Sequence, residues 1–164
     1  MEIIAGVITI SDKGYRGERI DKSGPEIIAI LEEMGISVRS LKIVPDEEEI
    51  IADALREFAD VKKFDLIVTT GGTGVSPRDV TPEATRRVIE KEIPGFAEAM
   101  RRESLAFTPH AMISRAVAGI RGTSLIINLP GSPKGVRENL AVILPAIPHA
   151  IEKIKGEESE CGSE

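Results

Sequence analysis

The chain has 164 residues, a length typical of one domain with a buried core. Its 41% apolar and 29% charged residues are an ordinary globular balance, and no apolar run approaches the roughly 20 residues that span a bilayer. The net charge of −6 and the absence of Trp argue against a nucleic-acid binder, and a single cysteine, Cys161, excludes an internal disulfide. The N-terminus has no basic segment of a signal peptide, so we expect a cytoplasmic protein.

The first predicted strand covers residues 3–10, which are rich in β-branched side chains, and ends at Ser11 and Asp12. Two glycines and mixed charges predict a mobile loop over residues 13–22. Residues 23–34 begin with the sequence SGPE, which is typical of a capping box with proline in the first turn. They therefore predict a helix.

A second strand is predicted over residues 36–44. Asp46 can cap the helix that follows, with Glu49 at the third helical position, and the apolar residues of 50–58 recur at helical spacing. Residues 66–69 are wholly apolar up to the last residue, which is typical of a buried parallel strand.

The second half of the chain continues this alternation. Thr81 is expected to cap a helix with proline at its first position, and residues 94–117 are expected to be helical but interrupted by prolines. A strand is predicted over 124–129, followed by a helical region that ends near Ile154.

Strands that alternate with helices at this spacing predict an α/β fold, with a mostly parallel sheet covered by helices on both faces. We expect one domain over residues 1–155, followed by a polar and disordered tail over 156–164 that contains Cys161. Ligands of such sheets bind beyond the carboxyl ends of the strands. The functional residues are therefore expected in the loops that follow the predicted strands.

The most conspicuous of these loops contains Gly71, Gly72, Thr73 and Gly74. Three glycines in four residues allow the backbone amides to approach a ligand closely. The loop is neither a Walker motif nor a dinucleotide fingerprint, because no Gly-Lys-Ser/Thr follows and Pro77 replaces the third glycine. Taken alone, it fits a tight structural turn as well as a phosphate cradle.

Two aspartates accompany these loops. Asp79 follows the glycines and Asp46 follows the second strand, and each could simply cap a helix or stabilise a turn. If both face one crevice, they form an acidic pair suited to magnesium beside a triphosphate.

A third loop, residues 128–134, offers Asn128, the amides of Gly131 and Ser132, and Lys134 as anion contacts, although Lys134 could also be a solvated lysine. Ser11 and Asp12 could hydrogen-bond a heterocycle or cap a turn. Other polar side chains have simpler interpretations: Arg78 is interpreted as a partner in a surface ion pair, and His110 and His149 as structural, because neither histidine shares a pattern with a nucleophile.

At these residues the sequence resembles the molybdopterin adenylyltransferase family, which includes MogA, MoaB and the G domain of gephyrin. The resemblance runs from about residue 3 to residue 155. It is carried by these stretches: ITISD (8–12), DKSGP (21–25), VPDE (44–47), TTGGTGVSPRDVTPEAT (69–85), PGF (94–96), ESL (103–105), SRAVAGIRG (114–122) and INLPGSPK (127–134). The seventeen-residue block around the glycines is the most specific of them.

The resemblance implies a three-layer fold with a mixed, mostly parallel sheet, assembled as a homotrimer or, in some members, a hexamer. It also implies a reaction in which the phosphate of molybdopterin attacks the α-phosphate of ATP, with magnesium required. The family's two essential aspartates correspond to Asp46 and Asp79, as catalytic residues and magnesium ligands. The expected ligand contacts are Ser11, Asp12, Thr70, Gly71, Gly72, Thr73, Gly74, Thr81, Asn128, Pro130, Gly131, Ser132 and Lys134.

Three alternatives stay open at this point. The chain could be a family member that binds molybdopterin or scaffolds a partner without catalysis. It could also act on another nucleotide or phosphorylated heterocycle, as a domain of this type in competence-damage-inducible proteins would. The third alternative is an unrelated α/β nucleotide binder.

Overall fold

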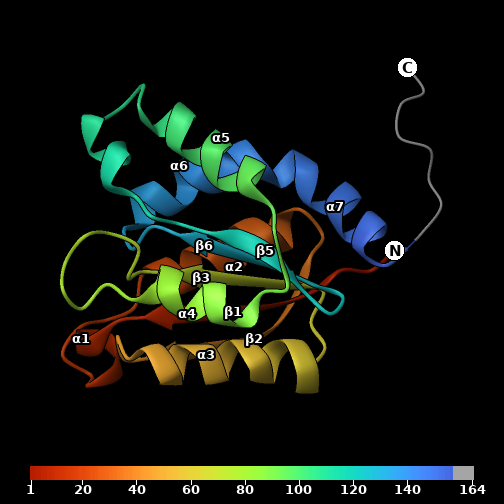
Figure 1. Cartoon of the computed structure of the whole chain (residues 1–164), viewed down its shortest axis with the longest axis horizontal. Coiled ribbons are helices and arrows are strands. Elements are labelled where there is room, and N and C mark those ends of the chain that lie inside the picture. The colour runs from red at the N-terminus through yellow and green to blue at the C-terminus, as the bar shows by residue number, and fades with distance from the viewer. Residues whose placement is uncertain (157–164) are drawn as a thin grey trace.

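A computed structural model describes residues 1–156 and shows a six-stranded sheet between two layers of helices (Figure 1). The strand order is β2-β1-β3-β6-β5-β4; β2, β1, β3 and β6 run parallel, whereas β5 is antiparallel to both of its neighbours. The strands are β1 (Ile4–Ile10), β2 (Ser37–Val44), β3 (Leu66–Thr70), β4 (Lys91–Glu92), β5 (Ala118–Arg121) and β6 (Ser124–Leu129). The expected mixed, mostly parallel sheet is confirmed.

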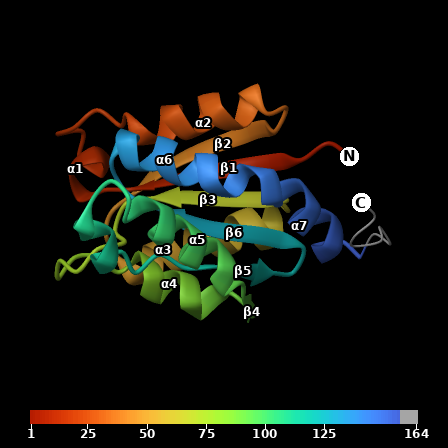
Figure 2. The ribbon, with the colours of Figure 1, turned by 90° about the horizontal axis from the view of Figure 1, so that it is seen from above.

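Helices cover both faces of the sheet (Figure 2). One core joins the sheet to α2, α5, α6 and α7, and the other joins it to α3 and α4. The helices are α1 (Asp12–Tyr15), α2 (Ser23–Glu33), α3 (Glu48–Arg56), α4 (Thr81–Val88), α5 (Pro94–Ser104), α6 (Pro133–Ile143) and α7 (Ile147–Ile154), with short helical turns η1 (Glu57–Val61), η2 (Pro109–Ile113) and η3 (Leu144–Ala146). This confirms the three-layer arrangement.

The four predicted strands occur within one residue of the expected bounds. The predicted loop over 13–22 instead begins inside the short helix α1, and the end of the segment 94–117 is extended rather than helical. β4 and β5 were not predicted. They are short, and β5 forms a hairpin with β6 around Gly122, whose φ of 56° suits the turn.

The expected capping box at Ser23 is wrong. The cap of α2 comes from Asp21, whose Oδ1 accepts a hydrogen bond from the amide of Gly24 at 3.0 Å. The hydroxyl of Ser23 instead donates to the carbonyl oxygen of Gly131 at 2.6 Å. A serine expected to serve its own helix therefore joins two loops that are far apart in the sequence.

Asp46 and Thr81 also do not cap the helices that follow them. No side chain caps α3 or α4, and the Asp46 carboxylate accepts a hydrogen bond from the amide of Asp12 at 2.9 Å. The Thr81 hydroxyl donates to the carbonyl oxygen of Gly71 at 2.9 Å. Tertiary contacts at the sheet edge take both side chains away from local capping.

Within residues 1–156, none of the helices has the length and apolar character required to cross a bilayer. Residues 157–164, which include Cys161 and nearly all of the tail expected over 156–164, lie outside the described residues.

Candidate functional site

The parallel strands end together at one edge of the sheet. Ile10 lies opposite Val44, and Thr70 lies opposite both Thr9 and Leu129 in the strand register. The loops that follow β1, β2, β3 and β6 therefore start side by side. This edge is where the sequence predicted the functional residues, and where ligands of parallel sheets bind.

A cleft of about 610 Å³ opens at this edge, and both Asp46 and Asp79 line it. The two aspartates therefore face one crevice, as the hypothesis of an acidic pair required. The cleft is lined by Thr9, Ile10, Ser11, Gly14, Arg19, Ile20, Asp21, Lys22, Ser23, Asp46, Thr70, Gly71, Gly72, Asp79, Gly131, Ser132 and Pro133.

The glycine loop forms the floor between the aspartates and has a backbone that only glycine adopts readily. Gly71 and Gly72 have φ values of 99° and 68°. A Cβ atom on Gly71 would overlap the carbonyl oxygen of Ile10, and one on Gly72 would overlap the Thr81 hydroxyl. These glycines thus allow close packing beneath the cleft.

The loop also presents unused donors. Among residues 1–156, no protein acceptor takes a hydrogen bond from the amides of Gly72, Thr73 or Gly74. Successive amides in such a loop form a concave site for anions. The free amides fit the predicted phosphate cradle, but of these three residues Gly72 alone lines the cleft; the predicted contacts Thr73 and Gly74 do not.

Asp46 is held by a reciprocal pair of backbone contacts. Its Oδ2 accepts from the Asp12 amide at 2.9 Å, and its own amide donates to Asp12 Oδ1 at 3.0 Å. Burial raises the pKa of Asp46, and the negative charges of Asp12 and Asp79 raise it further, against opposing effects of the Asp12 amide and Arg78. An extra positive charge in the cleft would stabilise the carboxylate form.

Arg78 makes the surface ion pair expected of it, and the structure identifies its partners. Its guanidinium donates two hydrogen bonds of 3.0 Å to the Asp12 carboxylate and one of 3.0 Å to Glu47. These bonds raise the pKa of Arg78, and the bond from Arg78 is the main reason that the pKa of Asp12 is lowered. The Asp12 carboxylate thus pairs with Arg78 instead of facing a ligand.

Arg115 is a supporting residue that the sequence interpretation missed. Its side chain donates to the carbonyl oxygens of Gly74 at 2.7 Å and Asp79 at 2.8 Å, and it pairs with Glu83. Its amide also donates to the carbonyl oxygen of Thr73 at 2.8 Å. Arg115 thereby fixes the loop that carries the free amides and Asp79. The only sequence signal was its place in the stretch 114–122.

Four residues that were not predicted also line the cleft: Arg19, Asp21, Lys22 and Ser23. Asp21 Oδ2 accepts from the Thr9 hydroxyl at 2.8 Å, which ties this segment to the end of β1. The stretch 21–25 belonged to the family resemblance, but nothing in its local pattern distinguishes a binding role from a helix start.

Several predicted contacts lie beneath the cleft surface. Thr70 lines the cleft but is 1% exposed and donates its hydroxyl hydrogen to Pro130 O, while Thr81 is 0% exposed and holds Gly71. Asn128 is also 0% exposed: its amide donates to Thr69 and Thr85, and its carbonyl accepts from the Val117 amide. The prediction that the Asn128 side chain contacts a ligand is therefore wrong. This side chain instead supports the edge of the sheet.

Replacement of Asn128 by alanine is expected to lower the free energy of unfolding by roughly 2–4 kcal/mol, because it leaves a buried Val117 amide and two hydroxyls without their partner. Urea unfolding followed by circular dichroism measures this loss. A variant as stable as wild type would contradict the supporting role.

The remaining predicted residues divide around the 130–135 turn. Gly131 and Ser132 line the cleft, whereas Pro130 and Lys134 line a separate cavity on the other side of the turn, together with Ser132. His110 also lines that second cavity, and His149 lies on α7, so neither histidine is in the cleft. Within residues 1–156, no three His, Cys, Asp or Glu side chains form a metal-binding group.

Comparisons with known proteins show the family to which the chain belongs. The family described as "Probable molybdopterin binding domain" matches residues 6–149. A protein named molybdopterin adenylyltransferase from Helicobacter pylori J99 is 46% identical over 153 residues, which cover 92% of this chain and 87% of the relative. Gephyrin from Dictyostelium discoideum is 51% identical over 160 residues, but the chain spans only 22% of its length.

Among solved structures, the molybdopterin biosynthesis enzyme MoaB from Thermus thermophilus superposes with a TM-score of 0.89. The two sequences are 50% identical, and the match covers 94% of this chain and 97% of the other.

Proposed function

Because the chain belongs to the family of probable molybdopterin-binding domains, we propose that it catalyses adenylylation of molybdopterin by ATP in molybdenum-cofactor biosynthesis. The observation that carries the proposal is that Asp46 and Asp79 line one cleft together with Gly72, whose amide has no protein acceptor among the described residues. A cleft with two carboxylates and an anion-binding floor suits a nucleotide tail accompanied by a divalent cation.

In the proposed reaction, a phosphate oxygen of molybdopterin forms a bond to the α-phosphorus of ATP. The bond from that phosphorus to the bridging oxygen breaks, and pyrophosphate leaves with the electron pair. The attacking oxygen belongs to the substrate, so no side-chain nucleophile is needed. The protein contributes alignment of the two substrates and amide donors for the charge that develops on the phosphates.

The donor set of the cleft fits Mg²⁺. Magnesium is commonly held by one or two carboxylates together with water and substrate phosphates. The pKa of Asp46 is raised by burial first and by the charges of Asp12 and Asp79 second, and a bound cation would favour its ionised form. We therefore assign Asp46 and Asp79 as the residues that would hold it. When bound, the ion would neutralise negative charge on the reacting phosphates.

The experiment that tests the function is an assay of purified protein with ATP, magnesium and molybdopterin, in which pyrophosphate and adenylyl-molybdopterin are both measured. We expect both products in equal amounts. Tight binding of molybdopterin without either product would instead support a binding or scaffold role.

Addition of EDTA in excess over the metal is expected to stop pyrophosphate release, and excess magnesium is expected to restore it. The thermal unfolding midpoint should not change with EDTA, because residues 1–156 contain no three-ligand metal group on which the fold depends. Turnover that continues in the chelator would refute the metal requirement.

The homotrimer implied by the family resemblance stays a prediction. Size-exclusion chromatography with light scattering should give about three times the chain mass of 17.7 kDa, or about six times that mass if two trimers associate into a hexamer. A mass of one chain would contradict the trimer.

A further inference from the structure

A groove with a volume of about 320 Å³ lies between α4 and α5, apart from the cleft. None of its lining residues lines the cleft, three of them are arginines and none is acidic. The groove is therefore a concentrated cationic surface on a chain whose net charge is −6. The lining residues are Pro82, Arg86, Arg101, Ser114, Arg115 and Ala116.

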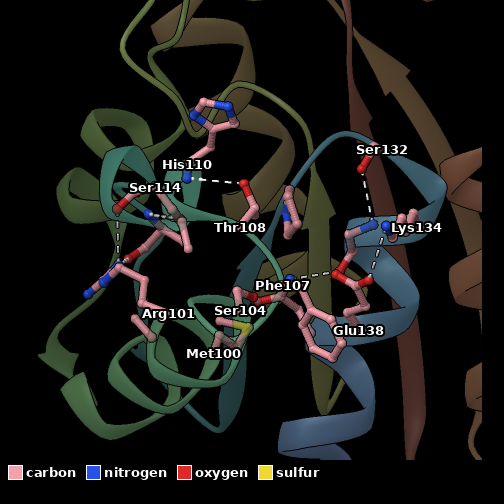
Figure 3. Close-up of a pocket in the computed structure, with 16 residues that line it drawn as sticks. Met100, Arg101, Ser104, Phe107, Thr108, His110, Ser114, Ser132, Lys134 and Glu138 are labelled. Atoms are coloured by element: carbon pink, nitrogen blue, oxygen red, sulfur yellow. Dashed lines mark hydrogen bonds and ion pairs between the residues drawn. The ribbon is translucent and has the colours of Figure 1, made fainter.

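Arg101 has no carboxylate partner among residues 1–156. Its Nη1 donates to the carbonyl oxygens of Ser114 at 3.4 Å and Ala116 at 3.1 Å, and its Nε and Nη2 have no protein acceptor in that part of the chain. Figure 3, a close view of the neighbouring cavity, shows the Arg101 guanidinium on the side of Ser114 and turned away from Phe107 and Lys134. One edge of this guanidinium is thus available to a ligand.

The other two arginines have carboxylate partners, to different extents. Arg86 is paired loosely: its Nη1 lies 3.4 Å from Glu92, while its Nε and Nη2 have no acceptor within the described part of the chain. Arg115 instead uses most of its donors on Glu83 and on two carbonyl oxygens of the loop 73–79. Arg115 therefore adds a fixed positive charge to the groove, and Arg86 adds a second available guanidinium edge.

These donors suit a small oxyanion with two negative charges. A phosphate group carries about two negative charges at neutral pH, and a guanidinium binds two of its oxygens through parallel hydrogen bonds. Arg86 and Arg101 each offer the Nε–Nη2 edge that such a bidentate contact requires. The Ser114 hydroxyl, which donates to no protein acceptor among residues 1–156, supplies a further donor.

We propose that this groove is a binding site for a phosphate-like oxyanion, held by Arg101 from α5 and Arg86 from α4, and separate from the cleft. Since α4 packs on one face of the sheet and α5 on the other, a bound anion would link the two helix layers. The site requires neither ATP nor molybdopterin. It therefore goes beyond the proposed function and does not depend on it.

Inorganic phosphate is the probe for this site. It is titrated into the full chain at constant ionic strength, and the Nε–H signals of Arg86 and Arg101 are followed by nuclear magnetic resonance. We expect both signals to shift along one binding curve. R101Q should weaken the phosphate affinity reported by Arg86 at least about tenfold, because it removes a charged bidentate donor. Phosphate bound at the glycine loop does not enter this measurement, because the signals belong to the groove.

R102Q is the matched control, since Arg102 is the next residue of α5, is 77% exposed and does not line the groove. It should bind phosphate like wild type. R86Q changes a side chain that is 57% exposed and should weaken the affinity reported by Arg101. It provides the test if R101Q does not fold.

Thermal unfolding gives a second readout. Phosphate stabilises proteins in general by exclusion from their surface, and that effect is the same for R101Q and R102Q. Specific binding adds to it, so the midpoint should rise more with phosphate in R102Q than in R101Q.

Arg86 and Arg101 signals that do not respond to phosphate, or equal affinities in R101Q and R102Q, would overturn the site. A lower mass of R101Q in light scattering without any phosphate response would assign the groove to a contact between copies of the chain, and would overturn it as well. None of these measurements uses turnover. A wild type that releases no pyrophosphate but binds phosphate through Arg101 would refute the proposed catalysis alone.

Discussion

Replacement of Asp46 by asparagine is expected to reduce pyrophosphate release at least about a hundredfold. The substitution removes one of the two carboxylates that line the cleft, but an asparagine oxygen could still accept the hydrogen bond from the Asp12 amide. The loss should therefore appear in kcat and in the magnesium concentration needed for half-maximal rate, both measured in the pyrophosphate assay.

The same variant should not be less stable than wild type at neutral pH. The pKa of Asp46 is raised in the folded protein, so its ionised form lowers the free energy of unfolding at pH values above that pKa. Asparagine resembles the protonated form and removes this cost. The difference in free energy of unfolding between the variant and wild type should shrink as the pH falls through the folded pKa of Asp46, because the Asp46 carboxylate of wild type then becomes protonated. Urea unfolding at several pH values measures it.

Two comparisons complete this experiment. Asp79→Asn should show a similar loss of turnover, because Asp79 faces the same cleft. Asp53→Asn, at an α3 side chain that is 74% exposed, should retain full activity. Near-normal turnover in both cleft variants would refute the metal role of the pair.

Replacement of Gly72 by alanine is expected to lower the free energy of unfolding by about 1–3 kcal/mol and to abolish most of the activity. The residue has a φ of 68°, and the new Cβ would overlap the Thr81 hydroxyl and lie 3.2 Å from Asp46 Oδ1. The loop must then shift, which displaces the free amide of Gly72 from the cleft. Thermal unfolding and kcat measure the two effects separately.

Gly95→Ala is the matched control for this substitution. Gly95 lies in the first turn of α5, and an added Cβ would meet nothing within 4 Å. Its stability should equal or exceed that of wild type, since alanine favours a helix more than glycine does. If Gly72→Ala behaves in the same way, the close packing of the glycine loop is not required.

Local patterns in the sequence were sufficient for the strands that carry the site. The apolar runs at 3–10, 66–69 and 124–129 form buried strands, because a covered sheet removes their side chains from water. The segment 36–44 alternates with polar residues and forms the partly exposed edge strand β2. The same patterns misplaced the helix caps expected at Ser23 and Asp46. Capping rules describe one helix at a time and contain no information about a competing partner 34 or 108 residues away.

The sequence by itself determined the α/β alternation, the glycine loop and the two aspartates as candidates, because these depend on spacing along the chain. Only the tertiary structure decided that Asp46 and Asp79 share a cleft, that Arg78 occupies Asp12, and that Asn128 is buried. The register of parallel strands sets which loops meet, and neighbouring charges set which side chains stay available. Both depend on contacts between residues that are distant in sequence.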